Sequence, residues 1–276
     1  MVDLSHPLAT KIRKQIVEAM ATYNMIEEGD KVMVCCSGGK DSSVLLALLT
    51  EIQRKAPYNF TLEAVTLDQK QPGFDAGPFQ AWVEGLGVKY TIIERDTYSI
   101  VKEKVTDGVY CSLCSRLRRG ILYDYAAEHG FTKMALGHHR DDLAETLLLN
   151  LFYTGKISSM PPKLKSDDGR NILIRPLSLV SELDLAALAK AWNFPVIPCN
   201  LCGSQENLKR KKMKRLLRDL EKDIPMIGNS ISTALGNIKI SQMSDMNLWN
   251  FNDLKADGRK DEPTGLDHFS GMPLGE

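Results

Sequence analysis

A glycine-rich segment between an apolar run and a leucine-rich stretch has the residue types needed to bind an anion. The segment S-G-G-K-D-S occupies residues 37–42 and follows the run V-M-V-C-C. Gly38 and Gly39 allow the backbone to approach a ligand closely. The N–H groups at the start of the expected helix, the serine hydroxyls and Lys40 all favour an oxyanion. The spacing is not that of a Walker A loop, and a glycine-rich turn without a ligand is the alternative.

Two C-x-x-C pairs are the second chemical feature, Cys111 with Cys114 and Cys199 with Cys202. Four thiolates can bind zinc tetrahedrally, but the pairs lie much farther apart than in zinc ribbons. An iron–sulfur cluster also takes thiolates and tolerates a distant ligand, and a redox disulfide is a third candidate. Spacing alone leaves zinc and iron–sulfur equally open.

Acidic and imidazole side chains gather where two further strands are expected to end. The segment G-H-H-R-D-D contains His138, Asp141 and Asp142 between a strand and a helix. These residues can contact Mg²⁺ or an anionic ligand, although two aspartates at a helix start can also simply cap it. Asp68 ends another strand at the expected ligand edge, with an ordinary Asx turn as the alternative.

Alternating strand and helix patterns over the first two thirds of the chain predict an α/β fold. Such an order indicates a parallel sheet with helices on both faces, and ligands then bind at the carboxyl ends of the strands. Residues 154–180 are expected to be rich in loops. The expected strands are 31–36, 61–68, 88–94 and 132–139, and the expected helices are 7–25, 41–54, 77–86, 112–129, 141–152, 182–192 and 205–221.

The last of these helices is strongly basic. Its apolar residues recur at helical spacing, so one face packs and the other is a basic stripe that includes Lys209, Lys212 and Arg215. Such a stripe can follow an RNA phosphate backbone, whereas a merely solvated helix face is the alternative. We expect one globular region over residues 1–250, with its core at about 31–200, and a flexible tail over 251–276.

Composition limits the class of protein. The chain has 276 residues, 43% hydrophobic and 25% charged, with a formal net charge of zero. No apolar run approaches the roughly 20 residues that span a bilayer, and no hydrophobic signal core begins the chain, so we expect a cytoplasmic protein without a membrane partner. A nucleic-acid partner then requires a local basic patch.

The glycine-rich segment after the first strand resembles the pyrophosphate loop of the N-type ATP pyrophosphatases. This resemblance implies a Rossmann-like PP-loop fold of the adenine nucleotide alpha hydrolase type. It also implies that ATP is cleaved between its α and β phosphates, with Mg²⁺ bridging the phosphates near Asp41. Asp141 or Asp142 would then contact Mg²⁺ or ATP, with His138 near the nucleotide and Asp68 near the adenosine. The residues that would hold the pyrophosphate portion are Ser37, Gly38, Gly39, Lys40, Asp41 and Ser42.

Over about residues 8–251 the chain resembles the tRNA 2-thiocytidine synthetases. The matching blocks are L-D-Q-K-Q-P-G-F, C-S-L-C-S-R-L-R-R-G-I-L-Y, L-G-H-H-R-D-D, G-K-I-S-S-M-P-P-K-L and I-P-C-N-L-C-G-S-Q. The resemblance implies a [4Fe–4S] cluster with three cysteine ligands, here Cys111, Cys114 and Cys202, which makes Cys199 the spare thiol. Arg118 or Arg119, one helical turn beyond Cys114, would then hold a phosphate of ATP or RNA, unless the pair is simply solvated.

The same resemblance implies the reaction. ATP adenylates the C2 oxygen of cytidine 32 in the tRNA anticodon loop. Sulfide held on the open iron of the cluster then replaces the adenylated oxygen at C2, which gives 2-thiocytidine. A cysteine desulfurase would supply the sulfur, and the chain would form a homodimer. Two rival functions remain, a PP-loop ATP pyrophosphatase with another substrate and a non-catalytic module that binds zinc and RNA.

Overall fold

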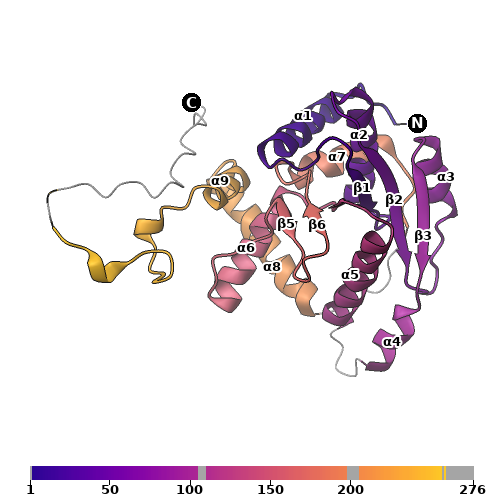
Figure 1. Cartoon of the computed structure of the whole chain (residues 1–276). Helices are drawn as coiled ribbons and strands as arrows, with labels where there is room; N and C mark the ends of the chain where they lie inside the picture. The colour runs from indigo at the N-terminus through magenta and orange to yellow at the C-terminus, as the bar shows by residue number, and fades with distance from the viewer. Residues whose placement is uncertain (1, 105–109, 198–204, 257, 259–276) are drawn as a thin grey trace. The chain divides into compact units, whose positions relative to one another are not determined.

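The centre of the fold is a six-stranded sheet (Figure 1). The computed structural model describes residues 2–104, 110–197, 205–256 and 258, without the side chains of residues 110–112, 205–208 and 253. The strand order is β3-β2-β1-β4-β6-β5, in which β5 runs antiparallel to β6 and the other pairs are parallel. The strands are β1 (Lys31–Cys35), β2 (Thr61–Asp68), β3 (Lys89–Glu94), β4 (Lys133–Ala135), β5 (Lys163–Lys165) and β6 (Ile172–Ile174).

Helices connect most of these strands and continue after them. Their bounds are α1 (Pro7–Thr22), α2 (Lys40–Lys55), α3 (Gly77–Gly85), α4 (Thr97–Lys104), α5 (Tyr110–Glu128), α6 (Arg140–Thr154), α7 (Glu182–Trp192), α8 (Gln205–Asp223) and α9 (Ile227–Leu235). No helix in the described part of the chain is both long enough and apolar enough to cross a membrane.

The central strand β1 shows how the sheet separates two hydrophobic cores. Successive side chains of a strand point to opposite faces. Val32 and Val34 belong to the core that contains the buried residues of α1, α2 and α7, whereas Met33 belongs to a second core with Leu122 and Ala126 of α5. Both faces of the sheet are therefore covered by helices, and β1 is buried on both sides.

The predicted α/β fold with helices on both faces is confirmed, with three corrections. The segment 154–180, expected to be loop, contains β5 and β6, and β5 makes the sheet mixed. The strand expected at 132–139 is only Lys133–Ala135, because the chain turns away at Gly137 to begin α6. Helices α4 and α9 were not predicted.

The chain divides into two compact units, Met1–Gly228 and Asn229–Glu276. The first contains the sheet and helices α1 to α8. The described residues of the second contain most of α9 and two 3₁₀ turns, Ile240–Gln242 and Phe251–Asp253. The expected division into one globular region of residues 1–250 and a flexible tail of residues 251–276 stays a prediction.

The order in which strands are added to the sheet reverses between β1 and β4. From β1 the chain proceeds outward through β2 and β3, and it then returns to place β4 on the other side of β1, where Val34 pairs with Ala135. Loops that leave two such strands diverge and open a crevice at their carboxyl ends. The loop after β1 is the glycine-rich segment, and the loop after β4 is the G-H-H-R-D-D segment.

Gly137 brings these two loops into contact. A Cβ atom on Gly137 would lie 2.9 Å from the backbone nitrogen of Ser42 and 3.1 Å from its Cα. The absence of a side chain therefore lets the loop after β4 pack directly against the first turn of α2.

We predict that Gly137→Ala lowers the free energy of unfolding by about 1–3 kcal/mol, because the backbone of one loop must move. The matched control is Gly120→Ala in α5, where a new Cβ meets nothing within 4 Å. That change should raise stability by about 0.5–1 kcal/mol, since alanine replaces glycine within a helix. Urea denaturation measures both variants. Equal midpoints for Gly137→Ala and wild type would contradict the close packing of the two loops.

Candidate active site

The glycine-rich loop presents the first turn of α2 to the crevice. Gly38 has a φ of +74°, in the left-handed region that favours glycine. Gly39 is the N-cap of α2 and is extended, with ψ 166°. Because the N-cap is a glycine, it has no side chain to compete for the N–H groups of the first turn. Those groups and the positive end of the helix dipole favour an anion.

Serine side chains hold this loop in shape. The Ser42 hydroxyl lies 3.2 Å from the backbone nitrogen of Ser37, which donates to it, and 3.3 Å from the Ser37 hydroxyl. Ser42 and Ser43 both donate to the Gly39 carbonyl, at 3.2 and 2.9 Å. The loop is thus ordered by its own hydrogen bonds.

Ile197 fixes the other side of the loop. Its backbone nitrogen donates to the Gly38 carbonyl at 3.0 Å, and a Cβ on Gly38 would lie 2.4 Å from the Ile197 Cβ. Two separate features therefore require glycine at position 38, its positive φ and this close contact with Ile197. Ile197 is the last described residue before the segment with Cys199 and Cys202, which lies outside the described residues.

The loop after β4 begins α6 with a reciprocal cap. His139 is the N-cap, and its Nδ1 accepts from the Asp142 backbone nitrogen at 3.4 Å. The Asp142 carboxylate in turn accepts from the His139 backbone nitrogen at 3.1 Å and lies 3.4 Å from its Nε2. Asp142 therefore does cap α6, as the alternative interpretation expected, and it also lines the pocket described below.

Asp141 has a different set of contacts. It accepts a 2.6 Å hydrogen bond from the backbone nitrogen of Glu182, at the start of α7, and pairs with Arg140 at 3.0 Å. Asp141 therefore joins the starts of α6 and α7. It is not among the residues that line the pocket.

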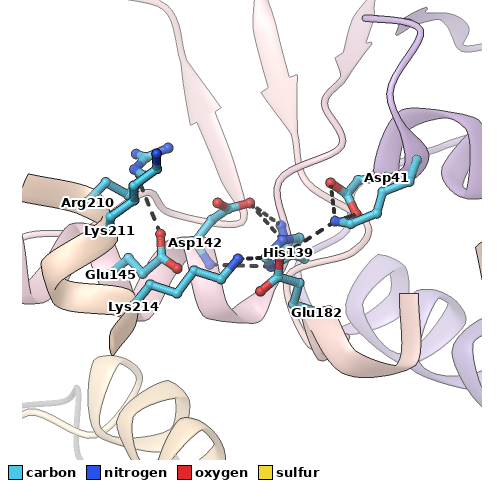
Figure 2. Close-up of a pocket in the computed structure, with 9 residues that line it drawn as sticks. Asp41, His139, Asp142, Glu145, Glu182, Arg210, Lys211 and Lys214 are labelled. Carbon is cyan, nitrogen blue, oxygen red and sulfur yellow. Dashed lines mark hydrogen bonds and ion pairs between the residues drawn. The ribbon is translucent and has the colours of Figure 1, made fainter. Parts of the chain in front are cut away.

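A pocket of about 250 Å³ opens in front of the two loops (Figure 2). Its walls come from the first turn of α2, from α6, from the start of α7 and from α8. Three predicted site residues, Lys40, Asp41 and Asp142, meet here. The full lining is Lys40, Asp41, His139, Asp142, Glu145, Glu182, Arg210, Lys211 and Lys214.

Glu145 is a pocket residue that the sequence analysis missed. It lies one turn beyond Asp142 on α6, and its side chain is only 4% exposed. Burial, and then repulsion from Asp142, raises the pKa of Glu145 to about 7, although Arg210 and Lys214 work against the shift. Its three-residue spacing from Asp142 on the predicted helix was the available signal, since such residues share a helix face.

Glu182 links the glycine-rich loop to the basic helix. Its Oε1 lies 3.7 Å from the Lys40 ammonium and also accepts a hydrogen bond from the Lys214 ammonium. Burial acts to raise the pKa of Glu182, but the hydrogen bond and charge of Lys214 and the charge of Lys40 outweigh it and lower the pKa. Glu182 is therefore an anion between two cations. No local motif in the sequence indicated this.

The two histidines occupy different positions. His139 lines the pocket, whereas His138, the predicted nucleotide contact, does not. Burial lowers the pKa of His138 to about 4, so its imidazole is neutral at pH 7. Its Nδ1 is buried without a hydrogen-bond partner among the described residues. A contact between His138 and the nucleotide stays a prediction.

Cys114 is the predicted cluster ligand whose side chain the structure describes. Its Sγ lies 3.1 Å from Oε1 of Gln69, the residue after β2, so the thiol approaches the carboxyl end of the sheet. Cys111 precedes it by one turn on α5. The side chain of Cys111, and all of Cys202, lie outside the described residues. Position and donor type at Cys114 fit a thiolate-ligated metal group at this edge.

Cys35 and Cys36 lie at the end of β1. Burial raises the pKa of the Cys35 thiol to about 12, partly opposed by the charge of Arg118, and burial raises the pKa of Cys36 further. Cys36 packs in the core of α1, α2 and α7. Both thiols are therefore protonated at neutral pH, and a buried, protonated cysteine behaves as a small hydrophobic residue.

Asp68 is buried at the end of β2. Its carboxylate accepts from the backbone nitrogen of Lys70 at 2.7 Å and lies 3.1 Å from the Lys70 ammonium. This is the Asx-turn geometry that we considered as the alternative. Its proposed proximity to the adenosine stays a prediction.

The predicted RNA-binding residues lie on two helices. On α8, Lys212 and Arg215 are exposed, and the Lys209 ammonium lies 4.7 Å from the centroid of the Tyr153 ring. On α5, Arg118 is half-buried and Arg119 is exposed. None of these five residues is among the pocket-lining residues of the described chain.

Comparisons with known proteins agree with this geometry. Residues 8–197 match the family model described as a PP-loop domain. A tRNA-cytidine(32) 2-sulfurtransferase of Bdellovibrio bacteriovorus is 66% identical over 255 residues, which cover 92% of this chain and 98% of that relative. One of Stenotrophomonas maltophilia is 54% identical over 258 residues, 93% of this chain and 83% of the relative.

A solved structure has a similar fold. It is the U34-tRNA thiolase NcsA from Methanococcus maripaludis with its [4Fe-4S] cluster, at a TM-score of 0.66 and 24% sequence identity. The similarity covers 84% of this chain and 80% of that one.

Glu145 gives a testable pH dependence. Its carboxyl is ionised above about pH 4.5 in the unfolded chain but only above about pH 7 in the folded protein. The folded state binds the extra proton between these values, so this group makes the protein less stable as pH rises through that window. We predict that Glu145→Gln, which stays neutral, gains about 1–3 kcal/mol over wild type between pH 4.5 and pH 8.

Urea denaturation at the two pH values measures this difference. Glu128→Gln, at an exposed position of α5, is the control and should show no pH-dependent gain. A stability difference between Glu145→Gln and wild type that does not change with pH would contradict the raised pKa.

Proposed function

This chain belongs to the PP-loop family and, within it, to the tRNA-cytidine(32) 2-sulfurtransferases, and from that membership we propose how its residues divide the reaction. It is an enzyme that transfers sulfur to cytidine 32 of tRNA and has an ATP-using PP-loop domain. The observation that carries the assignment of roles is the pocket where the first turn of α2, Lys40 and Asp142 meet at the ends of β1 and β4.

The glycine-rich loop binds the pyrophosphate portion of ATP. The N–H groups of the first turn of α2 and the hydroxyls of Ser37 and Ser42 surround the phosphates, and Lys40 adds a positive charge. Asp41 and Asp142 are the carboxylates that would hold Mg²⁺, an ion that prefers oxygen ligands. Asp68 and His138 would contact the nucleoside. Asp141 contributes by positioning the starts of α6 and α7.

The chemistry has two steps. The C2 oxygen of the cytidine attacks the α-phosphorus of ATP, the bond to the β-phosphate oxygen breaks, and pyrophosphate leaves. Hydrosulfide then attacks C2, the C2–O bond breaks, and AMP leaves with both electrons of that bond. The target base must leave its stack to reach the pocket.

Cys111, Cys114 and Cys202 would hold a [4Fe–4S] cluster. When bound with three protein ligands, such a cluster supplies a Lewis-acidic iron with an open position for a sulfur ligand. Burial keeps Cys35 and Cys36 protonated, which excludes them as competing thiolates at neutral pH.

The remaining assignments rest on charge pattern and composition as well as on the family resemblance. The tRNA anticodon loop would contact Arg118, Arg119, Lys209, Lys212 and Arg215, whose charges attract phosphates. A cysteine desulfurase would supply sulfur as a persulfide, from which a thiol reductant releases hydrosulfide with two electrons, and the enzyme would act in the cytoplasm as a homodimer. Residues 1–250 would form the functional region, with 251–276 as a tail.

The direct test is a reconstituted reaction. The anaerobically reconstituted enzyme is incubated with MgATP, sulfide and tRNA that lacks 2-thiocytidine, and the nucleosides are analysed by mass spectrometry. We expect 2-thiocytidine, with one AMP and one pyrophosphate per thiolated base. A tRNA with uridine in place of cytidine 32 is the substrate control and should gain no 2-thiocytidine. Thiolation at another base, or none, would contradict the proposal.

Cys114→Ser tests the cluster assignment. We predict a fall in 2-thiocytidine formation of about 100-fold or more, because a metal ligand is lost, together with loss of iron from the protein. ATP affinity should stay unchanged, because Cys114 is outside the pocket. Cys36→Ala, in the core, is the control for removing a thiol and should retain iron and thiolation. Full iron content in Cys114→Ser would exclude this residue as a ligand.

A further inference from the structure

Helix α8 has two basic sides with different neighbours. Arg210, Lys211 and Lys214 line the pocket beside the glycine-rich loop. Lys212 and Arg215 are exposed and are not part of that lining. The helix was expected to contact RNA, yet three of its cations face the ATP pocket instead.

Two of these three cations, Lys214 and Arg210, are paired with carboxylates in this structure (Figure 2). The Lys214 ammonium contacts Glu182, and the Arg210 Nε lies 3.8 Å from Glu145 Oε2. Glu182 and Glu145 belong to α7 and α6, so these pairs hold α8 against both helices. The carboxylates are 19% and 4% exposed, whereas the cations remain 32% and 45% exposed.

The contacts of Glu182 indicate where a phosphate oxygen could lie. The same oxygen atom, Oε1, contacts both the Lys214 ammonium and, at 3.7 Å, the Lys40 ammonium of the glycine-rich loop. Two cations on separate elements thus converge on one negatively charged oxygen. A phosphate oxygen in that place would satisfy both, and ammonium and guanidinium groups bind phosphate by charge-assisted hydrogen bonds.

We propose that Lys214 and Arg210 bind the polyphosphate of ATP, exchanging Glu182 and Glu145 for phosphate oxygens when the nucleotide enters. This inference rests on the proposed ATP-dependent function. In the absence of nucleotide, the two glutamates keep the cations over the glycine-rich loop. When ATP binds, Arg210 and Lys214 of α8 contact its phosphates. Lys212 and Arg215, on the other side of the helix, remain available to RNA.

The exchange is consistent with the charges around the pocket. Lys40, Arg210, Lys211 and Lys214 face Asp41, Asp142, Glu145 and Glu182. Three of these carboxylates, and Glu145 in its ionised form, compensate the four cations; because the pKa of Glu145 is about 7, that compensation is only partial at neutral pH. A polyphosphate adds negative charge, so the glutamates must give up their partners, while Mg²⁺ compensates the aspartates near the loop.

The test compares ATP affinity with tRNA affinity in the full-length protein. Lys214→Met and Arg210→Met keep the apolar part of each side chain, and each should weaken MgATP binding by about 10- to 100-fold in titration calorimetry without tRNA. Their affinity for tRNA, and its dependence on salt, should stay within about twofold of wild type. Lys222→Met is the matched control. It lies on the same helix, is 74% exposed, and should leave ATP affinity unchanged.

Glu182→Gln separates ligand binding from a merely structural role. Removing the competing charge should tighten MgATP binding several-fold, the opposite sign to Lys214→Met, and Lys214→Arg should restore most of the affinity. Structural damage would weaken binding in both the Lys214→Met and Glu182→Gln variants. Unchanged ATP affinity in Lys214→Met and Arg210→Met, or a loss confined to tRNA, would overturn the inference. A wild-type enzyme that binds ATP but forms no 2-thiocytidine would instead contradict the proposed function alone.

Discussion

The pairing of β1 with β4 is the constraint on which the site depends. These strands are far apart in the sequence, but Val34 pairs with Ala135, so the loops that follow both strands leave the same edge of the sheet. One loop ends in the N-terminus of α2, and the other begins α6 with its His139–Asp142 cap. Gly137 then allows direct contact between them. An anion site and a carboxylate site thereby become neighbours without any long side chain.

Charge compensation is the second requirement. The pocket gathers four cations, Lys40, Arg210, Lys211 and Lys214, which repel one another. Here the carboxylates of Glu145 and Glu182 offset that repulsion. Burial next to Asp142 raises the pKa of Glu145 towards neutrality. Lys214 and Lys40 lower the pKa of Glu182. At neutral pH Glu182 is therefore ionised more completely than Glu145.

The sequence predicted the parts of this fold that local patterns determine. The central strands were predicted from the apolar runs at 31–36 and 61–68, and the loop after β1 was predicted from its two glycines. It did not predict β5 or β6, because strands of three residues, K-L-K and I-L-I, are too short for a period to be seen. The strand expected at 132–139 was too long, since residues 136–139 connect β4 to α6 and His139 is the N-cap of that helix.

Glu182, unlike Glu145, is a pocket residue that no segment of the sequence could have indicated. Glu182 acquires its role from Lys40 and Lys214, which come from other helices, and no pattern within one segment encodes such a meeting. The basic helix shows the same limit. Its periodicity separates an apolar face from a basic one, but ATP and RNA both present phosphate oxygens, so residue type cannot say which cation serves which ligand. Only the packing of α8 against α6, together with the Lys214–Glu182 contact to α7, places Arg210 and Lys214 in the pocket lining and leaves Lys212 and Arg215 outside it.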